Sequence, residues 1–305
     1  MASLKHLKAR LRATHNIHQI TKAIEMVSVN KMRRSQTKAL AARPFSFAAM
    51  QILLNFSASS IESKDIVWFN EPLHAQKTML IVLASDKGLC GSFNAGILKI
   101  ALEFYRTHTD VEIVAVGKKA VSFFAARGVP IVWERESFGD AVVLDDVRDL
   151  ADFVTNAFAR TGEYKSVYAV YSKFISSFLN HPTVMQILPS SPEALRETLT
   201  YAVGAVQNET DVSLPSAPAP YNFDVPAEAL LNQTIPFLLE AQLYHIILET
   251  NAAEHSSRLL AMKNASDNSK NLHGRLQMAY NKTRQAIITR HIIEVASSKE
   301  VMDNA

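Results

Sequence analysis

The stretch Met79-Leu-Ile-Val-Leu-Ala-Ser-Asp-Lys-Gly-Leu-Cys-Gly-Ser-Phe-Asn94 joins an apolar run to a turn that contains two glycines. A short continuous apolar run followed by turn residues is typical of a strand buried on both faces of a sheet. Residues 94–107 then follow helical spacing, so the turn opens a helix. This strand–turn–helix unit predicts an α/β domain in the middle of the chain.

Further apolar runs on the C-terminal side predict more strands of the same kind. They are Val111–Val116, Val129–Trp133, Val167–Tyr171 and Thr183–Leu188. Between them, residues 118–127 and 144–160 have helical spacing. Alternating strands and helices predict a mostly parallel sheet with helices on both faces. Residues 207–226, rich in proline and acids, are expected to form a loop leading into the last helix.

The two ends of the chain exclude helix breakers. No glycine precedes Gly88 and no proline precedes Pro44. After Pro236 the chain has no further proline and a single glycine, Gly274. Long helices are therefore expected at both ends, with Pro44 kinking or ending the first. The apolar seam of the N-terminal helix is predicted at Leu4, Leu7, Leu11, Ile17, Ile20, Ile24 and Val27. The six-residue step from Leu11 to Ile17 predicts that this seam moves to another face of the helix.

The C-terminal helix repeats the same rhythm. Its predicted seam is Leu272, Leu276, Ala279, Ala286 and Ile293, with Thr283 and Arg290 at the intervening positions. If residues 1–43 and 237–305 are wholly helical, they reach about 65 Å and about 100 Å. Helices of that length must cover each other or enter a partner. We therefore expect an antiparallel coiled coil of the two ends with an inserted Rossmann-like parallel-sheet domain, divided as 1–60, 75–225 and 226–305.

Composition excludes several classes of protein. With 48% hydrophobic residues and a net charge of +3, the chain is too apolar and too weakly charged to be disordered. One cysteine cannot form an internal disulfide, which favours a reducing compartment. No apolar run approaches the roughly 18–20 residues that cross a bilayer, and no signal peptide is visible. We expect a soluble intracellular protein without direct membrane insertion.

Positive charge is concentrated at the N-terminus. Residues 1–43 hold ten Lys or Arg against one acid, Glu25. Such an arm binds nucleic acid in some proteins, but residues 1–44 contain no Phe, Tyr or Trp that would stack on bases. An arm that enters an acidic protein collar has the same charge. The charge distribution alone leaves both interpretations open.

No other motif makes a strong case for catalysis or metal binding. The turn Ser85–Asn94 lacks the spacing of known phosphate-binding loops, so a tight strand-to-helix turn is favoured over a nucleotide site. Cys90 has no neighbouring base and is expected to be a small buried residue. His15 and His18 have metal-ligand spacing without a third ligand. Four aspartates lie near the start of a predicted helix, where we expect their carboxylates to be solvated and not to bind a metal: Asp145, Asp146, Asp149 and Asp152. No catalytic, cofactor or metal residue is predicted.

Three segments of the chain resemble the gamma subunit of F-type ATP synthases. They are Ile20-Thr-Lys-Ala-Ile-Glu-Met-Val-Ser-Val-Asn-Lys-Met-Arg-Arg-Ser-Gln36, then Ser85–Asn94, and then Ala253-Glu-His-Ser-Ser-Arg258 with Ala261–Asn268 and Tyr280–Thr289. Intervening matches such as Gln242–Glu249 extend the similarity over essentially the whole chain.

The resemblance implies a function as well as a fold. It implies a non-catalytic rotating shaft inside a hexamer of α and β subunits, bound to the epsilon subunit and to the c ring in the membrane. Its place would be the cytoplasmic face of the bacterial plasma membrane. By resemblance, the contacts with the hexamer would be made by Arg284, Gln285, Thr289, Arg258, Lys87 and Ile24. Ile24 stands where many members have Met, and Lys87 where Arg is usual.

Two functions from other classes remain as alternatives. A Rossmann-like enzyme would bind a small ligand at the turn Asp86–Asn94. A nucleic-acid-binding protein would use the basic arm, and its affinity would fall steeply with salt.

Overall fold

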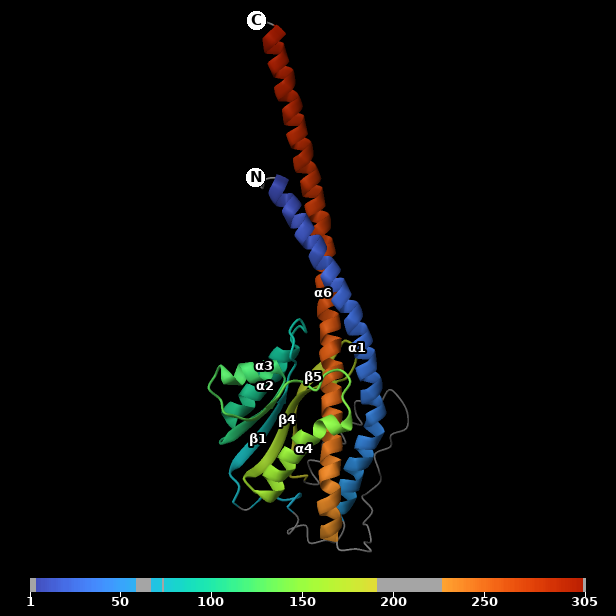
Figure 1. The fold of residues 1–305 in the computed structure, drawn as a ribbon, viewed down its shortest axis with the longest axis vertical. Helices are drawn as coiled ribbons and strands as arrows, with labels where there is room; N and C mark the ends of the chain where they lie inside the picture. The colour runs from blue at the N-terminus through green and yellow to red at the C-terminus, as the bar shows by residue number, and fades with distance from the viewer. Residues whose placement is uncertain (1–3, 59–66, 73, 191–226, 304–305) are drawn as a thin grey trace. The chain divides into compact units, whose positions relative to one another are not determined.

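A computed structural model describes residues 4–58, 67–72, 74–190 and 227–303 (Figure 1). The predicted loop at 207–226 lies outside these residues. The chain divides into two compact units, one formed by residues 1–27 with 259–305 and the other by residues 28–258. We refer to them as the coil unit and the sheet unit, and each is described by itself.

The predicted long helices are both present. Helix α1 spans Leu4–Ala58 and helix α6 spans Ala227–Asp303 (Figure 1). Pro44 lies inside α1 and Pro236 inside α6, so neither proline ends its helix. Proline has no backbone N–H, so each of these residues leaves one helical hydrogen bond unmade.

The sheet unit is built on five strands in the order β3-β2-β1-β4-β5. They are β1 Lys77–Leu83, β2 Val111–Val116, β3 Ile131–Arg135, β4 Tyr164–Phe174 and β5 Asn180–Leu188. The first four run parallel, and β5 pairs antiparallel with β4. The predicted mostly parallel sheet is confirmed. β4 is longer than its apolar run, because its ends carry polar residues that apolar periodicity does not detect.

Helices cover both faces of this sheet, as predicted. They are α2 Phe93–Thr107, α3 Lys118–Ala125, and a continuous helical segment made of the 3₁₀ turn η2 Leu144–Val147, α4 Arg148–Thr155 and the π turn η3 Asn156–Arg160. Leu80 and Val82 pack with α2 and α3 in one core, whereas Met79 and Ile81 belong to a second core with α4 and α6. Because successive strand residues face opposite sides, a strand buried on both faces must be apolar throughout.

In the coil unit, α1 and α6 pair antiparallel. Leu7 and Leu11 pack with Leu276 and Tyr280, and further along α1 the His18 Nδ1 lies 3.1 Å from the Ser266 carbonyl oxygen. Residues with higher numbers on α1 thus contact residues with lower numbers on α6, so the two helices run antiparallel.

The predicted move of the α1 seam is wrong. Buried and half-buried positions keep alternating steps of four and three across both units: Leu7, Leu11, Thr14, His18, Thr21, Glu25, Ser28, Met32, Ser35 and Ala39. Ile17 and Ile20 are instead 51% and 59% exposed. Thr14 and Thr21 donate their hydroxyl hydrogens to carbonyl oxygens one turn earlier in α1, so these polar groups are satisfied in the seam.

The α6 seam also differs from the prediction. Its buried and half-buried positions in the coil unit are Leu259, Leu260, Ala261, Met262, Ala265, Ser266, Ser269, His273, Leu276, Tyr280, Thr283 and Ile287. Only Leu276 and Thr283 were predicted correctly, whereas Leu272, Ala279, Ala286, Arg290 and Ile293 are exposed. The prediction followed apolar residues, but a row of small polar residues lies at the interface. None of the helices in the described residues is both long enough and apolar enough to span a membrane.

Candidate partner-binding sites

The turn Ser85–Asn94 connects the carboxyl end of β1 to α2 and is held by its own polar groups. The Asn94 side chain accepts a hydrogen bond from the Ser85 backbone N–H (3.0 Å) and donates to Ser85 Oγ (2.8 Å). Leu89 and Gly91 adopt positive φ angles of 63° and 58°. Cys90 is buried, as predicted, and its Sγ lies 3.1 Å from Asn94 Nδ2. The predicted tight strand-to-helix turn is confirmed.

Asp86 joins this turn to two neighbouring connections of the sheet unit. Its Oδ1 accepts hydrogen bonds from the backbone N–H groups of Lys118 and Ser137, both at 3.0 Å, and its Oδ2 accepts from Ser137 Oγ at 2.6 Å. Burial alone would raise the pKa of Asp86, but these hydrogen bonds outweigh burial and lower it. The carboxylate therefore orders the carboxyl edge of the sheet.

Replacing Asp86 by Asn is expected to lower the free energy of unfolding by about 1–2 kcal/mol at pH 7, because hydrogen bonds to a charged acceptor become neutral ones. The pKa of Asp86 is lower in the folded chain than in the unfolded chain. Its contribution to folding stability is therefore fully present above the unfolded-state pKa and is lost as the pH falls through the folded-state pKa. Urea unfolding at several pH values should show the difference from the parent shrinking below about pH 4. Asp152→Asn, at an exposed carboxylate on α4, is the control. An equal loss in both variants would contradict the role of Asp86.

Arg258 on α6 contacts the same turn. Its guanidinium donates to the carbonyl oxygens of Lys87 (3.3 Å) and Gly88 (3.3 Å) and pairs with Glu254 at 2.7 Å. The Arg258 and Glu254 side chains are only 12% and 13% exposed. Burial raises the pKa of Glu254, and the charge of Arg258 opposes this rise. The sequence argument missed Glu254, although its spacing of four residues from Arg258 is the signal of a helical ion pair.

The structure therefore brings Lys87 and Arg258 together in the sheet unit, where the Lys87 side chain is exposed. In the coil unit, Arg284, Gln285 and Thr289 lie exposed on α6, and Ile24 is half-buried on α1. Contacts of these six residues with a partner stay predictions.

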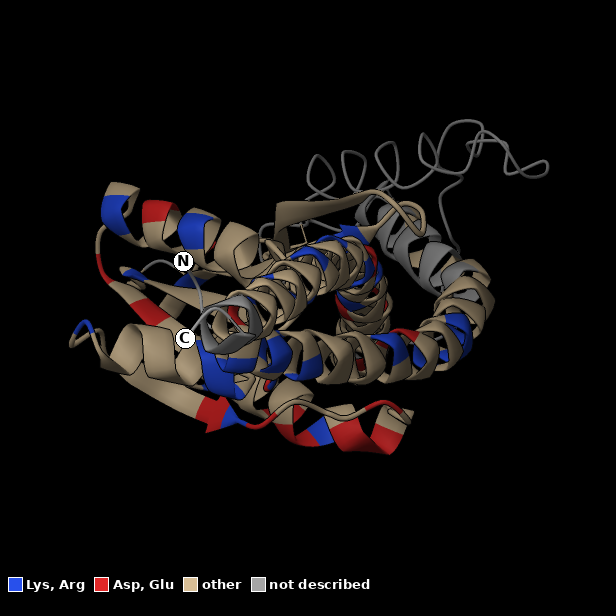
Figure 2. Cartoon of the chain, turned by 90° about the horizontal axis from the view of Figure 1, so that it is seen from above, with Lys and Arg blue, Asp and Glu red and all other residues tan. Residues whose placement is uncertain are grey.

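Exposed positive charge continues along α1. Figure 2 shows Lys and Arg recurring on this helix, and Lys5, Lys8, Arg10, Arg12, Lys22, Arg33 and Arg34 are exposed. Their side chains are thus accessible to an acidic partner.

The coil unit also exposes apolar side chains beside its polar seam. On α1, Ile17, Ile20 and Val27 lie three and seven residues apart and are more than half exposed. On α6, Ile288, Ile292 and Val295 lie four and three residues apart, with Val295 71% exposed. We call these two sets the apolar stripes. Large exposed apolar patches on folded proteins are common binding surfaces, so the apolar stripes are candidates for a partner contact.

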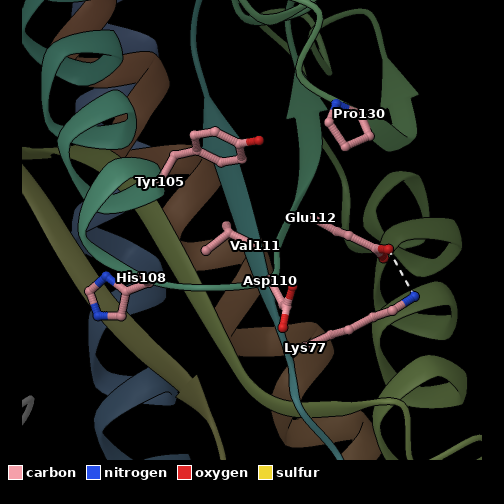
Figure 3. Close-up of a pocket in the computed structure, with 7 residues that line it drawn as sticks. All are labelled: Lys77, Tyr105, His108, Asp110, Val111, Glu112 and Pro130. Atoms are coloured by element: carbon pink, nitrogen blue, oxygen red, sulfur yellow. Dashed lines mark ion pairs between the residues drawn. The ribbon is translucent and has the colours of Figure 1, made fainter.

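A pocket of about 340 Å³ lies at the amino ends of β1 and β2, between them and the end of α2 (Figure 3). Lys77 and Glu112 in its wall form an ion pair of 2.9 Å, drawn as the dashed line in Figure 3. Glu112 also accepts a hydrogen bond from the Tyr164 hydroxyl, and its hydrogen bond and charge raise the pKa of Lys77. Open parallel sheets bind ligands at the opposite, carboxyl edge. The pocket therefore offers no support for the enzyme alternative.

The two histidines with metal-ligand spacing make other contacts. His15 lies beside the His273 ring, at 5.7 Å between centroids, and His18 bonds to Ser266. Within the described part of the chain, no group of three or more His, Cys, Asp or Glu side chains is arranged to hold a metal ion.

Comparison with solved structures places the fold in a class. The chain is similar to chains of the Euglena gracilis mitochondrial ATP synthase, with a TM-score of 0.65 and 17% identity over 98% of this chain and 94% of that one. It is also similar to a chain of the Tetrahymena thermophila mitochondrial ATP synthase central stalk and c ring, with a TM-score of 0.59 and 22% identity over 81% and 99%. The chain thus shares its fold with chains of solved ATP synthases.

Sequence comparison identifies the family. A family model described as ATP synthase matches residues 3–302. The ATP synthase gamma chain of Roseiflexus sp. (strain RS-1) is 34% identical, covering 97% of each chain. That of Chloroflexus aurantiacus is 33% identical, covering 97% of this chain and 98% of the relative. The chain belongs to the ATP synthase gamma chain family.

Proposed function

We propose that this chain is the non-catalytic rotating shaft of an F-type ATP synthase. It would turn inside the hexamer of α and β subunits, so that proton flow through the membrane c ring drives ATP synthesis and ATP hydrolysis drives the reverse rotation. Catalysis would belong to the hexamer, because each angle of the shaft favours a different nucleotide state of a catalytic site. The epsilon subunit would bind the same stalk at the cytoplasmic face of the bacterial inner membrane.

The observation that carries this proposal is the distribution of polar and apolar residues in the coil unit. Small polar side chains such as Thr21 and Ser266 alternate with apolar ones such as Leu11 in the seam, whereas the apolar stripes face outward. A coiled coil that is stable by itself in water keeps most of its apolar residues in the seam, because these residues drive the pairing. An enclosing partner would cover the stripes, and a smooth apolar contact suits a surface that must turn.

The exposed side chains of Arg284, Gln285 and Thr289 support the predicted contact with the β subunits, since all three are accessible on α6. Lys87 and Arg258 would form a second contact at the turn Ser85–Asn94. The basic residues on α1 would face acidic positions of the hexamer.

The test is to reconstitute the chain with α and β subunits of a related bacterium and with membranes that contain the c ring. The double variant Arg284→Ala, Gln285→Ala is expected to reduce ATP-driven proton pumping per ATP hydrolysed, while the helix content measured by circular dichroism stays unchanged. The matched control is Lys270→Ala, Asn271→Ala, two heptads earlier on the same face of α6 and equally exposed.

Equal pumping in the two double variants would contradict the assigned contacts. Failure of the parent chain to assemble with α and β subunits would contradict the shaft itself. If the isolated chain then bound DNA with an affinity that falls steeply with salt, the nucleic-acid alternative would be supported.

A further inference from the structure

Residues 139–142, which connect β3 to η2 in the sheet unit, are held by both long helices, and we call this segment the clip. We propose that the clip fixes α1 to α6 and to the sheet within the sheet unit, so that the parts of both helices in this unit turn with the sheet as one body. This inference rests on the proposed shaft function and assigns Asp140, Asn251 and Lys31 as positioning residues for the transfer of torque.

Helix α6 holds the clip at three points. Asn251 Nδ2 donates to the Gly139 carbonyl oxygen at 2.8 Å, and His255 Nε2 lies 2.7 Å from Asp140 Oδ1. The Tyr244 hydroxyl lies 3.5 Å from the Val142 carbonyl oxygen. Val142 itself is fully buried in the core that α6 shares with the sheet. The clip is therefore anchored to α6 by both polar and apolar contacts.

Helix α1 holds the same segment from its own side. Lys31 Nζ lies 2.5 Å from Asp140 Oδ2, and Lys38 Nζ donates to the Val142 carbonyl oxygen at 3.1 Å. Each of the two carboxylate oxygens of Asp140 thus bonds to a different long helix. Asp140 is a bridge between α1 and α6, and no substitute with a single acceptor oxygen reproduces it.

The bridge continues to the turn Ser85–Asn94. Arg258 Nη1 lies 3.4 Å from His255 Nδ1, and because a guanidinium only donates, Nδ1 accepts and the hydrogen is on Nε2. The neutral ring then donates to Asp140, and burial of His255, which lowers its pKa, agrees with this form. One hydrogen-bonded chain runs from the Gly88 carbonyl through Arg258, His255 and Asp140 to Lys31.

The two long helices depend to different degrees on this series of hydrogen-bonded side chains. α6 contributes seven buried residues between Ile235 and Leu248 to the sheet core. Of α1, Ala39 is buried in that core, and Ala42 and Ile52 pack against it. At residues 31–38 of α1, the directional bonds that Lys31 and Lys38 make to the clip set the rotation of the helix against the sheet.

Two measurements on Asp140→Asn test the proposal. The side chain is 45% exposed, so the isosteric change leaves the packing intact while its amide NH₂ faces either Lys31 or His255. Glu136→Gln is the matched control. Glu136 lies in the same connection between β3 and η2, but its ion pair is with Lys118 of α3 and not with a long helix. Hydrogen exchange of the free chain reports opening of α1, and angular fluctuations of a probe on the sheet unit report torsional stiffness in the complex with α and β subunits.

We expect Asp140→Asn to speed exchange of the α1 amides at 31–42 about tenfold, which corresponds to about 1.4 kcal/mol. Torsional stiffness of the complex should fall, with Glu136→Gln matching the parent in both measurements. A Lys31→Cys, Asp140→Cys variant should lose stiffness and regain it when a short bifunctional maleimide joins the two thiols. Cys90 is buried and is not expected to react.

If Asp140→Asn had the same hydrogen exchange and torsional stiffness as the parent, the proposed role of the clip would be overturned. Faster exchange with unchanged stiffness would overturn its role in torque while keeping the bridge as a local contact. Failure of the parent to assemble would instead overturn the shaft function, and the exchange data on the free chain would still separate the two results.

Discussion

Replacing Gly117 by alanine is expected to destabilise the sheet unit by at least about 3 kcal/mol, because the new Cβ has no space and the backbone is strained. An ideal Cβ at Gly117 would lie 2.1 Å from the Ala84 carbonyl oxygen and 2.7 Å from the Ala84 carbonyl carbon, and φ is 91°. Both neighbours are backbone atoms at the end of β1, so relief requires moving the strand away from β2. Thermal unfolding of the chain is the measurement.

Two control glycines separate the clash from the conformational strain. Gly128 has φ of 66° but no atom within 4 Å of an added Cβ, so Gly128→Ala should show only the strain of a left-handed residue, about 1–2 kcal/mol. Gly88 has neither a neighbour within 4 Å nor a positive φ, and Gly88→Ala should change stability by less than about 0.5 kcal/mol. If Gly117→Ala cost no more than Gly128→Ala, the close approach to Ala84 would be wrong.

Replacing Arg258 by alanine is expected to lower the free energy of unfolding by about 3 kcal/mol, because it leaves the mostly buried Glu254 carboxylate without its cation. The same variant removes the donors to the Lys87 and Gly88 carbonyl oxygens, so the turn Ser85–Asn94 should become more mobile. Urea unfolding at pH 7 measures the loss.

A double-mutant cycle assigns the cause of that loss. Glu254→Gln alone should have a smaller effect, and in the Arg258→Ala background it should recover much of the stability, because an uncharged amide tolerates burial better. Removing the cation also removes the charge that opposes the raised pKa of Glu254, so that pKa should rise further. A raised folded-state pKa makes the Arg258→Ala chain more stable as pH falls through it. Additive losses would contradict the ion pair as the cause.

The sites differ in how far the sequence could predict them. The position of Cys90, the tight turn and the strands around it follow from local apolar runs and turn residues, and these predictions are confirmed. The partners of Asp86 and Asp140, and the carbonyl oxygens that Arg258 meets, lie far away in sequence. His255 is 115 positions from Asp140, and Lys31 lies on the other long helix. No local pattern relates such residues, because the fold alone brings them together.

The coil shows the same limit in its register. Apolar periodicity correctly predicted two long terminal helices but assigned Ile17 and Ile20 to the seam, where the structure places Thr21 and Ser266. Periodicity assumes that apolar residues lie inside, and this assumption fails for a coil whose outer face is suited to a partner. The division into 1–60, 75–225 and 226–305 stays a prediction beside the two compact units.

The sequence by itself determined which segments are helices and strands, because exclusion of Gly and Pro from the ends and apolar runs in the middle act over neighbouring residues. It also carried the family resemblance, through motifs that span the chain. Only the tertiary structure decided which face of each long helix pairs, which carbonyl oxygens Arg258 meets, and that Asp140 bridges α1 and α6. Those choices depend on the free energy of packing distant segments together, and that energy is set by the whole fold rather than by any one stretch of residues.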